Sequence, residues 1–230
     1  MRTRAATLVL ALAAAAAALP LHAQVPPTAA EVAAYQGLHA AAHRGDLPAI
    51  QRLAANKAAL EARDGAARTA LHVATFARQH QAVQALLHGG ADHAAFEQGR
   101  YDAVTIAAVA DDEETLRVLL AGGASAKLTT SRYDGTALIA AAHLGHDGVV
   151  RQLIAAGAPL DHVNNLHWTA LIESIVLGDG GRRHVESLRA LVEAGASTKL
   201  TDREGRTPLA LAQSRGYAEM VRILQQAGAR

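Results

Sequence analysis

Two histidines four residues apart, His39 and His43, have the spacing in this sequence that best suits a metal site. On a helix, residues at i and i+4 lie on the same face, so both imidazoles could reach one ion. A protein zinc site needs at least one further ligand, and the sequence does not show which residue would supply it. We therefore predict that these histidines are structural and that they bind no metal.

A run of four acidic residues, Asp111 to Glu114, offers carboxylates, which are the ligands that calcium prefers. The run stands where a helix is expected to begin. The helix dipole favours negative charge at that end, which explains the carboxylates without a metal ion. We predict a helix N-terminus here, with a calcium site as the alternative.

The segment from Gly178 to His184 reads GDGGRRH, a combination of glycine and arginine that could cradle a phosphate. Phosphate loops follow a strand and lead into Lys-Ser or Lys-Thr, and this segment has neither context. The sequence also holds no GxSxG, HExxH or GxGxxG motif and no cysteine nucleophile. We predict a solvated surface loop at this segment, no catalytic residues and no cofactor.

The first 23 residues have the features of a bacterial export signal. Arg2 and Arg4 supply positive charge, and an apolar run extends from Ala5 to Leu19. At about 15 residues, the run is shorter than the roughly 20 that span a bilayer. We predict a signal peptide cleaved after Ala23 and a periplasmic protein with no membrane association after cleavage, with an uncleaved anchor as the alternative.

The composition favours a helical fold. Half of the residues are hydrophobic, mainly Ala, Leu and Val, and seven are aromatic (one Trp, four Tyr and two Phe). Small and unbranched side chains suit closely packed helices. The chain has no cysteine, which excludes disulfides and thiolate metal sites. Removing the two arginines of the signal takes the formal charge from +1 to −1, so we expect no nucleic-acid partner.

The pair Gly-Ala recurs at nearly constant intervals of 33, 34, 38 and 33 residues. Such a period indicates an array of structural repeats. Repeats that contact only their neighbours build an extended surface, which favours binding over catalysis. The pairs are Gly90-Ala91, Gly123-Ala124, Gly157-Ala158, Gly195-Ala196 and Gly228-Ala229.

A second motif lies upstream of these pairs, as TALHVA from Thr69, TALIAA from Thr136, TALIES from Thr169 and TPLALA from Thr207. It resembles the T-P-L-H-x-A signature of ankyrin repeats. The resemblance implies an all-α solenoid of about six helix-turn-helix units with short hairpin fingers. We expect the signal peptide at 1–23, a linker at 24–34 and an ankyrin repeat domain at 35–230, with units at about 35–63, 64–96, 97–130, 131–163, 164–201 and 202–230.

Each motif element has a predicted local role. The Thr caps the first helix of its unit, and in the third unit Asp102 takes its place. Gly145 and Gly216 end the first helix and let the chain turn into the second. The resemblance implies that His39 and His72, at the His of the motif, hydrogen-bond to the turn of the repeat.

The resemblance also places a partner-binding site, because the concave face of ankyrin arrays is lined by the first helices and the fingers. The exposed positions of the expected first helices are apolar in the middle of the array and polar at its ends. Aromatic side chains exposed among small residues are typical of binding hot spots. We predict an anchor of Phe76, Tyr101, Tyr133 and Trp168, with Leu166, His143, Leu144 and Val176 beside it and His43, Arg44 and Arg215 at its rim.

These observations favour a non-enzymatic, monomeric periplasmic scaffold or adaptor that binds another protein. One alternative is an immunity protein that neutralises a toxin delivered to the periplasm. A second is a protein that binds a metal or small ligand, or an enzyme, built on His39, His43 and the acidic run.

Overall fold

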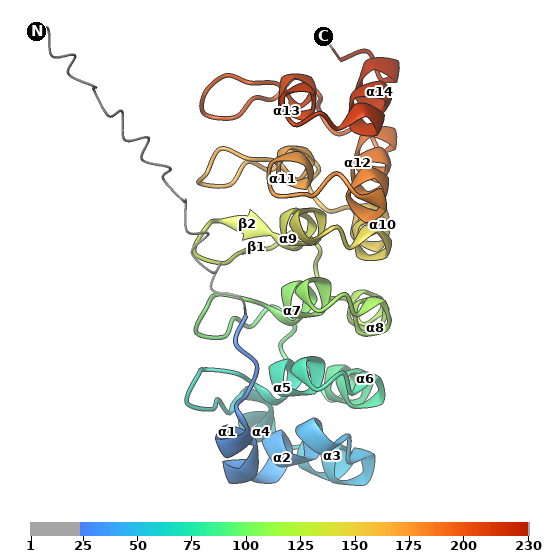
Figure 1. Cartoon of the computed structure of the whole chain (residues 1–230). Coiled ribbons are helices and arrows are strands. Elements are labelled where there is room, and N and C mark those ends of the chain that lie inside the picture. The colour runs from blue at the N-terminus through green and yellow to red at the C-terminus, as the bar shows by residue number, and fades with distance from the viewer. Residues whose placement is uncertain (1–23, 230) are drawn as a thin grey trace, which may run out of the picture.

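The computed structural model describes residues 24–229. The predicted signal peptide, residues 1–23, lies outside the described residues. Within them, six helix-turn-helix pairs stack in a single row (Figure 1), which confirms the predicted solenoid. The first helices are α2 (Gly37–Arg44), α5 (Ala70–Phe76), α7 (Ala103–Val109), α9 (Ala137–Leu144), α11 (Ala170–Val176) and α13 (Pro208–Ser214). The second helices are α3 (Leu47–Leu53), α6 (His80–His88), α8 (Glu113–Ala121), α10 (Asp147–Ala155), α12 (Arg182–Glu193) and α14 (Ala218–Gln226).

The first helices begin at the predicted capping residues. The hydroxyl oxygens of Thr136, Thr169 and Thr207 each accept a hydrogen bond from the backbone N–H three residues later, at 3.3, 3.2 and 3.2 Å. Asp102 does the same through its carboxylate, which lies 3.1 Å from the nitrogen of Thr105. Each bond satisfies a backbone donor that the first helical turn would otherwise leave unpaired.

Glycine forms the turn between the paired helices of the fourth and sixth units, as the sequence predicts, whereas Arg78 and Asp111 take the positive φ at this turn in the second and third units. Gly145 follows α9 with a φ of 68°, in the left-handed region that side chains rarely adopt. It also lies against a neighbouring repeat, because a Cβ added there would be 3.0 Å from the ring of His184. Gly216 has a φ of 69° at the equivalent turn of the last unit.

Both motif histidines make the hydrogen bonds that the family resemblance implies. The Nε2 atom of His39 lies 2.9 Å from the carbonyl oxygen of Arg68, and Nε2 of His72 lies 3.0 Å from that of Ala95. Each bond therefore joins a first helix to the following connection of the chain.

The acidic run is the start of a helix. Asp112 precedes α8, and its Oδ1 accepts a hydrogen bond of 3.0 Å from the backbone N–H of Thr115. Glu113 and Glu114 follow in the first turn, where the helix dipole stabilises their charge.

The segment from Gly178 to His184 differs from the predicted loop. Helix α12 begins at Arg182, so the last three residues of the segment form a helical turn and the loop stops at Gly181. The side chain of His184 fixes this turn, with Nδ1 2.8 Å from Oδ1 of Asp179 and Nε2 2.9 Å from the carbonyl oxygen of His143. The extra residues therefore lengthen α12 to 12 residues, compared with nine in α10.

Arg183 reaches from this turn to two earlier repeats. Its guanidinium lies 2.8 Å from Oδ2 of Asp111 and 3.2 Å from Oδ1 of Asp147. Asp111 lies between α7 and α8, and Asp147 opens α10. One side chain thus connects the third, fourth and fifth units.

The hairpin connections that precede the first helices, here called the fingers, project from one side of the stack (Figure 1). One finger carries a short antiparallel pair, β1 (Thr129–Thr130) with β2 (Gly135–Thr136), in which Thr129 pairs with Thr136. Adjacent fingers are joined by backbone hydrogen bonds from Gln98 N–H to the oxygen of Ala66 (3.0 Å), from Ser131 to Arg100 (2.9 Å) and from Asn165 to Tyr133 (3.0 Å). These bonds fix the spacing of the fingers.

A continuous apolar core runs through the stack between first and second helices, with Leu71, Leu138, Leu153 and Leu171 almost fully enclosed. Helix α4 (Lys57–Glu61) adds Leu60 to this core. None of the helices in the described part of the chain is both long and apolar enough to cross a membrane.

The segment 24–34, expected to be a linker, contains helix α1 (Ala29–Ala34). Arg68 ties this segment to the repeats, because its guanidinium binds Glu31, Oδ2 of Asp64 (2.7 Å) and the carbonyl oxygen of Val25 (3.2 Å). The Arg68 side chain is only 1% exposed. These bonds compensate the cost of burying its charge.

Candidate partner-binding surface

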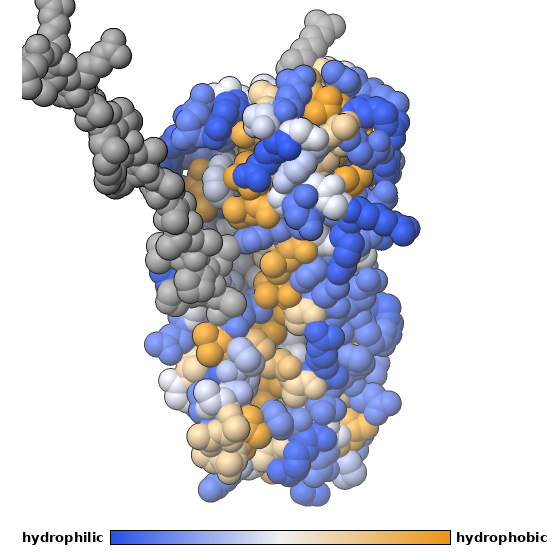
Figure 2. All heavy atoms as spheres, viewed as in Figure 1, coloured by the Kyte–Doolittle hydropathy of each residue, from blue (hydrophilic) through white to orange (hydrophobic). Residues whose placement is uncertain are grey.

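The exposed ends of α9 and α11 form an apolar surface in the middle of the array. Leu144 and Leu177 are 40% and 39% exposed, which is unusual for large hydrophobic side chains in the described part of the chain. A space-filling view of one face shows hydrophobic residues gathered in a band over the first helices (Figure 2). This agrees with the prediction that the strip is apolar in its middle.

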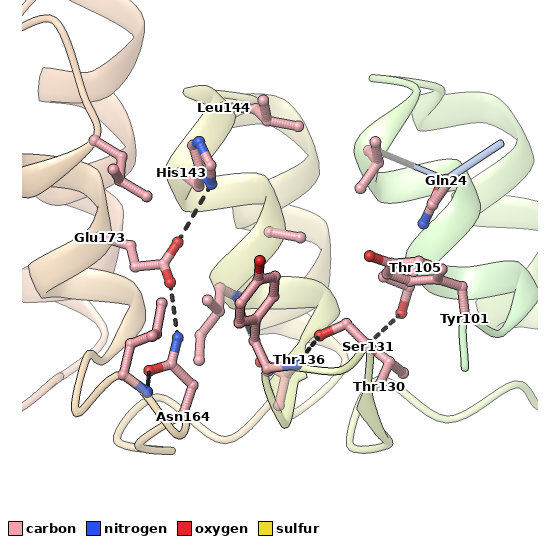
Figure 3. Close-up of a pocket in the computed structure, with 17 residues that line it drawn as sticks. Gln24, Tyr101, Thr105, Thr130, Ser131, Thr136, His143, Leu144, Asn164 and Glu173 are labelled. Carbon is pink, nitrogen blue, oxygen red and sulfur yellow. Dashed lines mark hydrogen bonds and ion pairs between the residues drawn. The ribbon is translucent and has the colours of Figure 1, made fainter. Parts of the chain in front are cut away.

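A cavity of about 310 Å³ opens between the fingers and the first helices α7, α9 and α11 (Figure 3). Its volume is in the range of sites that accept a small ligand or a partner side chain. The apolar and aromatic part of its lining comprises Tyr101, Val109, Tyr133, Ile139, Ala140, Leu144, Leu166 and Leu177.

One carboxylate, that of Glu173 on α11, also lines the cavity. The residue is 4% exposed. Its Oε1 accepts a hydrogen bond of 2.8 Å from the side-chain amide of Asn164, and its Oε2 lies 3.4 Å from Nδ1 of His143 (Figure 3). Asn164 is itself held in place, because its Oδ1 accepts the backbone N–H groups of Leu166 and Trp168, both at 3.0 Å.

The opposite end of the cavity is formed by hydroxyl groups and by Gln24. Thr105 donates from its hydroxyl to Oδ1 of Asp102 at 2.5 Å and lies 3.3 Å from the hydroxyl of Thr130. Burial raises the pKa of the Asp102 carboxyl. The side-chain nitrogen of Gln24 is buried and lacks a hydrogen-bond partner among the described residues.

The cavity brings together five of the predicted partner-binding residues, namely Tyr101, Tyr133, His143, Leu144 and Leu166. The other six predicted residues are not part of its lining, namely Phe76, Trp168, Val176, His43, Arg44 and Arg215. Trp168 and Val176 are partly buried and pack against the core, so less of their surface faces outward than the sequence suggested.

Sequence reasoning missed the residue that sets the cavity apart, Glu173. It stands four residues after the N-cap of its helix. The same position in the other five first helices holds Ala40, Val73, Ile106, Ala140 and Leu211. An aligned comparison of the repeats would have shown this single charge among apolar residues. No comparable signal marked Gln24, because it precedes the repeats.

Among the described residues, no group of three or more His, Asp or Glu side chains is arranged to hold an ion. His39 and His43 instead lie beside the ring of Tyr35, with ring centroids 5.5 and 6.5 Å apart.

Stacked helix pairs with an apolar groove along the first helices define a helical-repeat binding protein. The family models for ankyrin repeats match residues 38–87, 104–202 and 204–230. The chain belongs to the ankyrin repeat family, as the sequence motifs indicated. Ankyrin repeats are protein–protein interaction modules.

Relatives of the chain include bacterial proteins. An ankyrin repeat domain of Acinetobacter baumannii AYE is 42% identical, covers 84% of this chain and 98% of its own, and superposes with a TM-score of 0.79. The ankyrin repeat protein YahD of Escherichia coli (strain K12) is 41% identical over 100 residues, which are 43% of this chain and 50% of YahD. The chain therefore matches half the length of this curated relative.

A more distant neighbour comes from the complex of the predatory endopeptidase Bd0816 with the immunity protein Bd3460 of Bdellovibrio bacteriovorus. The matched chain is 23% identical, with a TM-score of 0.68, and the match covers 84% of this chain and 98% of that one. At this identity, the likeness shows a shared fold.

Proposed function

We propose that this chain is a non-enzymatic, monomeric periplasmic scaffold or adaptor that binds a partner protein through its concave face. The observation that carries the proposal is the half-exposed pair Leu144 and Leu177 at the mouth of an apolar cavity. Large apolar side chains exposed together beside a cavity mark interaction sites. The ankyrin fold supports binding in general, and the exposed pair points to this part of the array.

The proposal is tested by capture of a partner from the native host. The full chain, with an affinity tag at its C-terminus, is compared with a Leu144→Ser/Leu177→Ser variant, and bound proteins are identified by mass spectrometry. Gln225→Ser/Gln226→Ser is the control, because both glutamines are exposed on the second helix α14, away from the first helices and the fingers. We expect a protein that the parent and the control retain and the Leu144→Ser/Leu177→Ser variant loses.

Truncating an interface anchor costs about 2 kcal/mol or more, which weakens binding at least about 30-fold. Capture that is equal for all three proteins would contradict the concave-face assignment. Periplasmic location is tested separately, by cell fractionation and by the mass of the mature N-terminus. A mass that begins at Gln24 is expected, and one that begins at Met1 would rule out cleavage.

An immunity role is the second candidate. It is favoured by the fold shared with a chain of the Bdellovibrio endopeptidase–immunity protein complex. If the captured partner is a toxin, co-expression of the chain should protect cells from it, and the Leu144→Ser/Leu177→Ser variant should not. A scaffold would instead capture a resident protein whose activity the host needs. A small-ligand site is the remaining alternative, because the cavity has the volume of such sites. In that case, the capture experiment should yield no partner protein.

A further inference from the structure

The buried carboxylate of Glu173 occupies a position that the other repeats fill with an apolar side chain. Placing a charge in an apolar site destabilises a fold unless the charge is paired. The repeat architecture itself does not need this carboxylate, because five other first helices form without one.

Two other carboxylates that are wholly or partly enclosed have a cationic partner, which Glu173 lacks. Asp64 pairs with Arg68 at 2.7 Å, and Asp202 pairs with Arg206 at 2.6 Å. No Lys or Arg of the described residues lies within ion-pair distance of the Glu173 carboxylate. The titratable side chain beside it is the imidazole of His143.

Helix capping explains the remaining buried carboxylates but not this one. Asp102 and Asp112 each cap a helix and accept a backbone N–H of its first turn. Glu173 lies at the end of the first turn of α11, and the hydrogen bond seen at its carboxylate comes from the neutral amide of Asn164. Its Oε2 has His143 at 3.4 Å, which is longer than an ordinary hydrogen bond.

We propose that the cavity receives a basic side chain, Lys or Arg, of the partner protein, with its cation at the Glu173 carboxylate. This inference rests on the proposed function, since it names the chemistry of the partner at the same site. The alkyl stem of such a side chain lies against the apolar walls of the cavity, which include Leu166 and Leu177. Lysine and arginine bury their stems in this way while their charged ends find a polar partner.

The cavity suits a basic side chain better than either a free metal ion or an uncharged apolar group. A metal ion needs several oxygen or nitrogen ligands, whereas Glu173 is the one carboxylate of the lining and no group of three or more His, Asp or Glu side chains among the described residues is arranged to hold an ion. An uncharged apolar group would enclose the Glu173 carboxylate further without supplying a counter-charge. A cation on an aliphatic stem pairs with the Glu173 carboxylate and packs its stem against the apolar wall.

The test uses small probes and does not depend on identifying the partner. The isotopically labelled full chain is titrated with n-butylguanidinium and, as an uncharged control, n-butanol, and binding is followed by NMR shifts of backbone amides. We expect the cation to shift amides of α9 and α11 saturably and to bind about tenfold more tightly than n-butanol. Equal binding of the two probes, or no binding of the cation, would overturn the proposal.

A Glu173→Gln variant gives a second readout. Glutamine retains an oxygen that can accept the Asn164 hydrogen bond but removes the charge. We expect the variant to lose the preference for n-butylguanidinium, whereas unchanged preference would place the cation elsewhere. If the variant fails to fold, the comparison of n-butylguanidinium with n-butanol on the parent chain still tests the proposal. A negative result leaves capture of a partner through Leu144 and Leu177 unaffected, so the two proposals fail separately.

Discussion

The burial of His72 predicts that the fold is less stable in acid. Its Nδ1 accepts the backbone N–H of Thr69 at 3.1 Å, so Nε2 carries the proton and donates it to the carbonyl oxygen of Ala95 at 3.0 Å. Both ring nitrogens are therefore engaged in the neutral form. Burial, the largest cause, lowers the pKa of His72 from 6.5 to about 4.

The size of the effect follows from this pKa difference. In the unfolded chain, His72 takes up a proton as the pH falls through about 6.5, whereas in the folded chain it stays neutral until about 4. The unfolded state thus binds more protons in this window, and the free energy of unfolding decreases as the pH falls. Between pH 7.5 and 5, His72 alone should remove about 2 kcal/mol of stability.

Urea unfolding followed by circular dichroism at pH 7.5 and 5 measures this loss. Other groups also titrate, so the quantity that isolates His72 is the loss in the parent minus the loss in a His72→Gln variant. The variant should be less stable than the parent at pH 7.5, because its core hydrogen bonds change. Between pH 7.5 and 5, however, its free energy of unfolding should fall by about 2 kcal/mol less than that of the parent. Replacement of the exposed His167 by Gln is the control. If the parent and His72→Gln lose the same stability, the burial argument is refuted.

Three further predictions concern the framework around the binding surface. Arg68→Met leaves the partly enclosed Asp64 carboxylate without its cation, so we expect about 3 kcal/mol lower stability and faster amide exchange in α1. Leu153→Ala opens a cavity in the core and should cost about 3 kcal/mol in urea unfolding, whereas no change would mean that the site collapses freely. Asp112→Ala should lower the free energy of unfolding by about 1 kcal/mol, because α8 loses its cap. Asp112→Asn should keep most of the parent's stability, because asparagine also caps helices.

The fold was predictable because its signals are local and repeated. A capping Thr and a glycine turn each act within one unit, so residues such as Thr136 and Gly145 could be assigned from the motif alone. The helical turn at Arg182 to His184 was not predictable in this way. It depends on contacts of His184 with the previous unit, which a local motif does not contain.

The candidate site was predictable in outline. The exposed register of the first helices indicated Leu144 and His143, and the finger positions indicated Tyr101 and Tyr133. Trp168 also lies at a finger position, but it is partly buried and packs against the core, and its role as an anchor stays a prediction. Glu173 was not predicted, because the exposed positions were sought near the end of each first helix. Glu173 stands four residues after the N-cap, at a position where the motif predicts a buried side chain.

The reach of Arg183 across two units affects how the array comes apart. In a repeat protein whose units touch only their nearest neighbours, the ends fray one unit at a time. A bond from the fifth unit to Asp111 of the third adds a constraint that skips a unit, so the third, fourth and fifth units gain cooperativity. Because α7, α9 and α11 belong to these three units, we expect the helices around the cavity to unfold together, after the units that flank them.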